Sequence, residues 1–162
     1  MLIKSRAFVF GDYVDTDLIY PSIYLGFFDP AVMGKHAMEG CDPEFPNKIK
    51  DGGIVVAGKS FGIGSAREQA PASLKYAGVG CVAAEYFARS FFRNAVNVGL
   101  PMIILPKGVG WIKEGDQMEI DIERALARNL TTGEERQGVP LPSMVWEILS
   151  AGGAVNYFKT RL

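Results

Sequence analysis

A short glycine-rich stretch carries the residues best suited to chemistry. Residues 62–70 read Gly-Ile-Gly-Ser-Ala-Arg-Glu-Gln-Ala. Ser65 offers a hydroxyl group, which acts as a base only where neighbouring groups stabilise its anion strongly. Arg67 offers a planar guanidinium group, which can bind a carboxylate through two parallel hydrogen bonds. A serine and an arginine at this spacing, directly after Gly64, predict a site for an anionic ligand.

The elements expected around this stretch support the same interpretation. Residues 54–56 form an apolar β-branched run, and residues 66–77 place apolar or small side chains at helical spacing. A strand, a glycine-rich loop and a helix in this order direct backbone N–H groups at an anion. We expect Ser65 to be the N-cap of the helix and Arg67 to lie in its first turn. Because arginine is unfavourable at the positive end of a helix dipole, this position indicates that an anion binds there.

Two nucleotide-binding patterns are excluded by their context. Residues 53–60 match the Walker A pattern formally, but the four residues between its glycines are the expected strand itself, and Lys59 is followed by more loop. The dinucleotide fingerprint is absent because Arg67 stands where its third glycine would be. An anion-binding module without chemistry of its own nevertheless stays open as an alternative class of function.

Composition limits the other classes of function. The chain has 162 residues and is 48% hydrophobic, which suits a single domain over residues 1–162 with a substantial core. A net charge of −1 favours neither nucleic acid nor an anionic membrane as a partner. No N-terminal apolar run is long enough for a signal or a membrane span, and two distant cysteines suit a reducing cytoplasm. Cys41, Cys81 and His36 are too few soft ligands for a metal site, so we expect none in this chain.

The order of the elements predicts an α/β fold. Strands are expected over residues 2–10, 54–56, 80–84 and 102–105, and helices over residues 66–77 and 86–98. This order favours a β-α-β-α-β core with parallel strands and right-handed crossovers. Residues 125–130 and 134–139 flank a Thr-Thr-Gly turn and predict a hairpin. A further helix over residues 31–38 carries His36, to which we assign no role.

Three motifs together resemble the mobile domain of the aconitase superfamily. Residues 62–70 resemble the active-site loop of that superfamily, usually written G-x-G-S-S-R-E-H-A. Residues 11–21 (GDYVDTDLIYP) resemble its G-D-x-x-D-T-D-x-I-x-P motif. Residues 87–95 (FARSFFRNA) resemble its S-F-A-R-I-F-x-R-N-A segment. These motifs extend over most of the chain up to about residue 105 and are highly specific for the superfamily.

The resemblance implies a fold and an activity. The implied fold is a β/β/α swivel domain of the aconitase C-terminal type, with a mostly parallel small sheet, flanking helices and an added hairpin layer. The implied activity, given the chain length, is that of the small subunit of a hydro-lyase that isomerises 2-isopropylmalate and 3-isopropylmalate by dehydration and rehydration in leucine biosynthesis. It implies a large subunit that carries a [4Fe–4S] cluster, in a heterodimer or heterotetramer, and no cofactor in this chain.

The resemblance also assigns roles to residues of the site. Ser65 matches the serine base, and Arg67 matches the arginine that holds a substrate carboxylate. Asp17 matches an active-site aspartate, which we expect to orient Arg67 or another polar group. Gly64 and Ala66 are expected to contact substrate through the backbone. The chain departs from the motif at Ala66, where a second serine is usual, and at Gln69, which replaces a frequent histidine.

Residues 22–28 (SIYLGFF) contain no charged side chain. The stretch is either a buried anchor for the loop or the wall of an apolar pocket. Relatives that bind tricarboxylates place an arginine there, so an apolar substrate group is expected. Isopropylmalate is the first choice, then a methylated malate, then homocitrate or citrate, for which the partner would have to supply the arginine. A structural or regulatory swivel domain without activity is the remaining alternative. The expected substrate-binding residues in this stretch are Tyr24, Leu25, Gly26 and Phe27.

Overall fold

The structure, a computed structural model, describes residues 1–161 and contains one curled sheet. Its strand order is β4-β3-β2-β1-β5-β6-β7, with parallel pairing from β1 to β4 and antiparallel pairing from β1 through β5 and β6 to β7. The predicted parallel core and the predicted hairpin are therefore confirmed. The strands are β1 (Leu2–Val9), β2 (Gly53–Ala57), β3 (Val79–Ala84), β4 (Met102–Ile104), β5 (Gln117–Asp121), β6 (Leu126–Asn129) and β7 (Glu135–Gln137).

Local sequence signals account for several helix ends. Asp29 caps α2 by accepting hydrogen bonds from the backbone of Ala31 and Val32, with Pro30 at the first position. Gly78 and Gly99 end α4 and α5 in the left-handed conformation, which glycine adopts without steric cost. The helices are α1 (Thr16–Ile19), the 3₁₀ helix η1 (Ser22–Tyr24), α2 (Pro30–Gly34), α3 (Phe45–Lys48), α4 (Gln69–Ala77), α5 (Arg89–Val98), α6 (Ser143–Ser150) and α7 (Ala154–Lys159).

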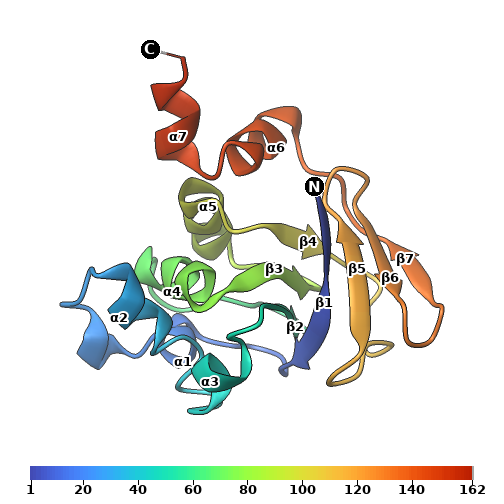
Figure 1. Cartoon of the computed structure of the whole chain (residues 1–162), viewed down its shortest axis with the longest axis horizontal. Coiled ribbons are helices and arrows are strands. Elements are labelled where there is room, and N and C mark those ends of the chain that lie inside the picture. Colours follow the sequence, from blue (N-terminus) through green and yellow to red (C-terminus); the bar gives the residue numbers. More distant parts are fainter. Residues whose placement is uncertain (162) are drawn as a thin grey trace.

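The sheet separates two apolar cores. Figure 1 shows α2 and α4 on the side of β1 where β2, β3 and β4 lie, and β5, β6 and β7 on its other side. In β2, Val55 points to the core that α2, α4 and α5 cover, whereas Ile54 and Val56 point to the core shared with β5 and β6. Every residue of β2 is buried, as expected for a central strand of a covered parallel sheet. The end of β2, from which the glycine-rich loop departs, is thus held rigidly from both faces.

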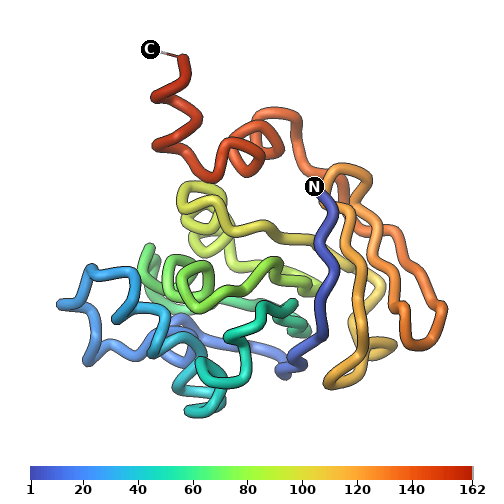
Figure 2. The backbone as a smooth tube through the Cα atoms, viewed as in Figure 1, coloured from blue at the N-terminus to red at the C-terminus, as the bar shows by residue number. Residues whose placement is uncertain are grey.

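The edges of the sheet curl until they meet. An isolated antiparallel bridge joins Ile104 at the end of β4 to Val139 beyond β7, with a backbone hydrogen bond of 2.9 Å from Val139 to Ile104. The last two helices, α6 and α7, contact α5 and end the chain away from the sheet (Figure 2). The Lys75 ammonium group links this region to α4 by donating to the carbonyl groups of Val98 and Gly152. No helix within residues 1–161 is long and apolar enough to cross a membrane.

Three helix boundaries differ from the predictions. The helix α4 begins at Gln69, so Ser65 is not its N-cap and Arg67 does not lie in its first turn. The Ser65 carbonyl oxygen accepts hydrogen bonds from the Arg67 N–H at 2.8 Å and from the Thr16 hydroxyl at 3.1 Å. These bonds hold residues 65–68 in a loop. The helix α5 begins at Arg89 rather than at residue 86, and α2 ends before His36.

Candidate functional site

The glycine-rich loop lies along the N-terminal Asp-rich segment. Four backbone hydrogen bonds of 2.7–3.2 Å join residues 11–16 to residues 58–63. The Asp12 carboxylate accepts a further bond of 2.8 Å from the Lys59 N–H. The Asp15 carboxylate caps α1 by accepting from the Asp17 N–H at 2.7 Å. Two of the three aspartates in the motif thus fix the backbone, which leaves Asp17 for the site.

A close approach explains why glycine precedes Ser65. The backbone of Gly64 has a φ of +97°, a conformation that side chains disfavour. A Cβ atom at this position would lie 2.5 Å from a carboxylate oxygen of Asp15. Gly64 therefore lets the loop pass close to Asp15, the N-cap of α1, and this close contact fixes the position of the next residue, Ser65.

Arg67 is held by Asp17. The Nη1 atom of Arg67 donates to the Oδ1 atom of Asp17 at 2.9 Å, and the backbone N–H of Ser22 donates to the same oxygen at 2.7 Å. The hydrogen bond from Arg67, followed by that from Ser22, lowers the pKa of Asp17 below its usual range. Asp17 is therefore charged at neutral pH, and the expected orientation of Arg67 by Asp17 is present.

Ser65 is exposed at the turn of the loop, next to exposed Ala66. Its hydroxyl group makes no hydrogen bond with any residue of the described chain, and the backbone N–H groups of Ser65 and Ala66 are unpaired there too. The helix α4 starts at Gln69, so the unpaired N–H groups of Ser65 and Ala66 belong to the loop and not to the first turn of the helix. The arrangement presents a free hydroxyl group and unpaired donors two residues from a fixed guanidinium group.

Residues 22–28 divide into an anchored part and an exposed part. Tyr24 and Leu25 are half-buried against the core under the helices. Ile23, Phe27 and Phe28 are 77%, 49% and 74% exposed. The expectation of a buried anchor therefore describes only two side chains, and three large apolar side chains are available to a ligand or a partner.

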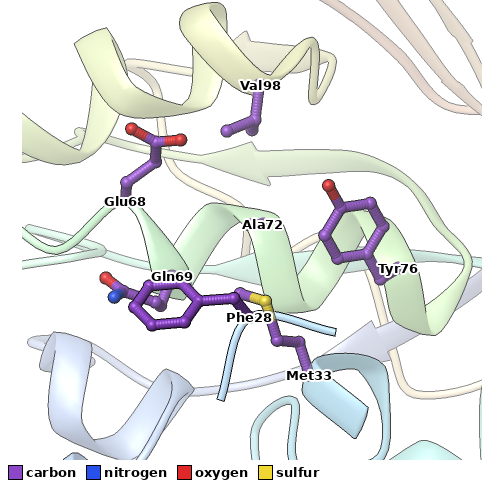
Figure 3. A pocket seen from close by; sticks show the side chains of 7 residues that line it. All are labelled: Phe28, Met33, Glu68, Gln69, Ala72, Tyr76 and Val98. Carbon is purple, nitrogen blue, oxygen red and sulfur yellow. The ribbon is translucent and has the colours of Figure 1, made fainter. Parts of the chain in front are cut away.

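A pocket of about 270 Å³ opens beside the end of the loop (Figure 3). Figure 3 shows Glu68 and Gln69 at one end of it and Tyr76 at the other. Phe28 is the one residue of the 22–28 stretch among its lining residues in the described chain. Ser65, Arg67, Asp17, Gly64, Ala66, Tyr24, Leu25, Gly26 and Phe27 do not line it.

The sequence indicated only part of this lining. Phe28, Glu68 and Gln69 lie within the stretches 22–28 and 62–70 that the sequence singled out, but none of the three was among the predicted site residues. Met33 and Val98 belong to α2 and α5, and nothing in their local spacing distinguishes them from other core residues.

Potential metal ligands are scattered within residues 1–161. The described residues contain no group of three or more His, Cys, Asp or Glu side chains placed to hold a metal ion. Cys81 lies in the core that β2 shares with β5 and β6, where burial raises the pKa of its thiol, and Cys41 is a separate exposed thiol. A cluster needs several thiolate ligands, and these two cysteines cannot supply them.

Known proteins resemble this chain over nearly its whole length. The family described as the aconitase C-terminal domain matches residues 40–107. The 3-isopropylmalate dehydratase small subunit of Pyrobaculum calidifontis is 55% identical over 161 residues, which cover 99% of each chain. The isopropylmalate/citramalate isomerase small subunit of Methanocaldococcus jannaschii is 49% identical and covers 99% of this chain and 96% of its own. A crystal structure of 3-isopropylmalate dehydratase from the same organism superposes with a TM-score of 0.94 at 46% identity, covering 99% of this chain and 95% of that one. The chain belongs to the family of 3-isopropylmalate dehydratase small subunits.

Proposed function

We propose that the chain is the small subunit of a hydro-lyase that interconverts 2-isopropylmalate and 3-isopropylmalate by dehydration and rehydration. The observation that carries the proposal is the Arg67 guanidinium group, fixed by Asp17 at 2.9 Å, two residues from the exposed Ser65 hydroxyl group. In this assignment Arg67 binds a substrate carboxylate through its planar fork. Ser65 removes the proton from the carbon next to the one that loses its hydroxyl group, and water then adds back at that neighbouring carbon.

The loop donors support the role of Ser65. A serine hydroxyl group is a weak base, so its anion has to be stabilised by donors that are already in place. In this assignment the unpaired backbone N–H group of Ala66 supplies such a donor without the second serine that is usual in the motif. The positive charge of Arg67 adds to this stabilisation because it lies on the same loop.

The apolar loop supports a substrate with an alkyl group. Residues 22–28 contain neither lysine nor arginine, Phe27 and Phe28 are exposed, and Phe28 lines the pocket. Glu68 lines the same pocket, so a third substrate carboxylate there would meet a negative charge. Burying an unpaired carboxylate costs several kcal/mol. Each buried CH₂ of an isopropyl group instead stabilises the complex by about 0.8 kcal/mol.

A large subunit completes the proposed enzyme. Loss of the substrate hydroxyl group requires a Lewis acid, which we assign to a [4Fe–4S] cluster on the large subunit, in a heterodimer or heterotetramer. Large apolar side chains are exposed on segments that adjoin the loop, and a partner that covers the site would bury them. These side chains are Tyr13, Leu18, Ile23, Phe27, Phe28 and Tyr86. We further propose a cytoplasmic location, which the free thiols of Cys41 and Cys81 support.

A methylated malate is the second candidate substrate. The relative from Methanocaldococcus jannaschii is named for both isopropylmalate and citramalate. A methyl group buries less apolar surface than an isopropyl group, so the loop favours the larger substrate.

The test is reconstitution with the large subunit. The two chains are co-expressed, the cluster is assembled anaerobically, and turnover of 3-isopropylmalate, citramalate and isocitrate is followed through the unsaturated intermediate. We expect the highest kcat/KM for 3-isopropylmalate. A higher kcat/KM for isocitrate would refute the assignment of an apolar subsite, and no turnover of any of the three would refute the proposed activity.

A further inference from the structure

Tyr24 is held by two side chains of the segment that follows α2. Its ring stacks on the His36 ring, with centroids 3.7 Å apart and 16° between the planes. Its hydroxyl group donates to Oε1 of Glu39 at 2.8 Å, and Oε2 of Glu39 lies 2.5 Å from Nδ1 of His36. One carboxylate therefore joins both rings, and the three side chains form a closed cluster. We call Tyr24, His36 and Glu39 the aromatic clamp.

The hydrogen bond to the Glu39 carboxylate raises the pKa of the Tyr24 hydroxyl group. A phenol ordinarily titrates well above neutral pH, and this shift moves its titration further away. Tyr24 thus remains a proton donor to Glu39 under working conditions.

The segment that carries His36 and Glu39 is tied to α1. The backbone N–H of Met38 donates to the Ile19 carbonyl at 2.6 Å, and that of Gly40 donates to the Leu18 carbonyl at 3.1 Å. A Cβ atom on Gly40 would lie 2.6 Å from the Leu18 Cα atom, so glycine permits this contact. These contacts keep the clamp in a fixed position relative to α1.

The same short helix carries Asp17, which binds Arg67 and the backbone of Ser22. Residues 22–28 are therefore attached at two points to α1 and the segment packed on it. Asp17 holds their first residue, Ser22, and Glu39 holds Tyr24. The Tyr24 carbonyl oxygen also accepts from the Phe27 N–H at 3.0 Å and from the Tyr20 hydroxyl group at 3.0 Å. The conformation of the exposed Phe27 and Phe28 thus depends on where Tyr24 is held.

We propose that His36 and Glu39 are positioning residues that act through Tyr24. They hold residues 22–28 at a fixed distance from Arg67, so that the loop meets the alkyl group of the substrate while Arg67 holds its carboxylate. This inference rests on the proposed function. It assigns a role to His36, for which the local sequence pattern indicates none.

The test compares Glu39→Ala with Glu39→Gln and with a matched control in the assembled complex. Glu39→Ala removes the acceptor of both rings, whereas Glu39→Gln keeps one neutral acceptor oxygen for Tyr24. Glu147→Ala is the control, because Glu147 on α6 accepts a similar bond of 3.0 Å from Tyr157 on α7. His36→Ala removes the stacked ring and tests the second residue of the clamp.

We expect Glu39→Ala and His36→Ala to raise KM for 3-isopropylmalate by about fivefold to tenfold while kcat changes by less than about twofold. Glu39→Gln should recover most of the affinity, and Glu147→Ala should change neither constant. Hydrogen–deuterium exchange of residues 22–28 in the substrate-free complex should accelerate in Glu39→Ala and not in Glu147→Ala.

An unchanged KM in an active Glu39→Ala complex would overturn the proposal, as would unchanged exchange over residues 22–28. If the wild-type complex does not turn over 3-isopropylmalate, the proposed function fails. The exchange measurement still decides the positioning role in that case, because it requires no substrate.

Discussion

Gly26→Arg tests whether residues 22–28 face the variable group of the substrate. A Cβ atom at Gly26 would have no atom within 4 Å, and its backbone φ lies outside the left-handed range. The arginine therefore enters without steric conflict or backbone strain. Because the position is exposed, we expect the free energy of unfolding to change by less than about 0.5 kcal/mol. Any change in substrate preference then reports on the added charge.

The size of the effect follows from the charge that is added. A hydrogen bond to a charged group contributes about 1.5–3 kcal/mol, and every 1.4 kcal/mol corresponds to a factor of ten. If the new guanidinium group pairs with the third carboxylate of isocitrate, the ratio of kcat/KM for isocitrate to kcat/KM for 3-isopropylmalate should rise roughly tenfold to a hundredfold.

The assay measures kcat/KM for both substrates in the complex with the large subunit. Gly110→Arg is the matched control, because Gly110 is also exposed, a Cβ atom there would likewise have no atom within 4 Å, and the variant adds the same charge elsewhere. A ratio that is equal in the two variants would refute the placement of residues 22–28 at the substrate.

Three further predictions concern the glycine-rich loop. Ser65→Ala should lower kcat by about a hundredfold or more, with KM and complex assembly nearly unchanged, because it removes the proposed base; retention of a tenth of kcat would contradict that role. Arg67→Lys should raise KM and lower kcat together, since an ammonium group cannot form the two parallel hydrogen bonds, and unchanged kinetics would exclude a bidentate contact. Gly64→Ala should lower the free energy of unfolding by about 2–4 kcal/mol through backbone strain and the conflict with the Asp15 cap. Gly133 has a similar φ of +82°, but a Cβ atom there would have no atom within 4 Å, so Gly133→Ala should show the effect of backbone strain alone. If urea unfolding gave the same loss of unfolding free energy for both variants, the conflict with Asp15 would be disproved.

The parallel core was predictable because its signals are local. The β-branched run at residues 54–56 and the left-handed glycines Gly78 and Gly99 determine strand and helix limits within a few residues. The start of α4 was not predictable in this way. Ser65 carries the side chain of a good N-cap, but Thr16, 49 residues earlier, binds its carbonyl oxygen and keeps the chain out of the helix.

The candidate site likewise contains residues that a local motif reveals and residues that only tertiary contacts reveal. Ser65, Arg67 and Asp17 could be predicted as site residues because a specific motif carries them, and the structure contains an ion pair between Arg67 and Asp17. His36 and Glu39 belong to no motif, and their contact with Tyr24 depends on how residues 36–40 pack on α1. Side chains that act through tertiary contacts leave no periodic signal in the sequence.

Under the proposed function, one carboxylate oxygen connects substrate binding with substrate choice. Oδ1 of Asp17 accepts from both the Arg67 side chain and the Ser22 backbone, so a change at Asp17 affects Arg67 and residues 22–28 together. Gly26 has no side chain in these bonds, and a Cβ atom there would have no atom within 4 Å. A cation can therefore be added at Gly26 without removing a contact of Asp17, Ser22 or Arg67. Under the proposed function, the same serine and arginine then act on substrates that differ only in their variable group.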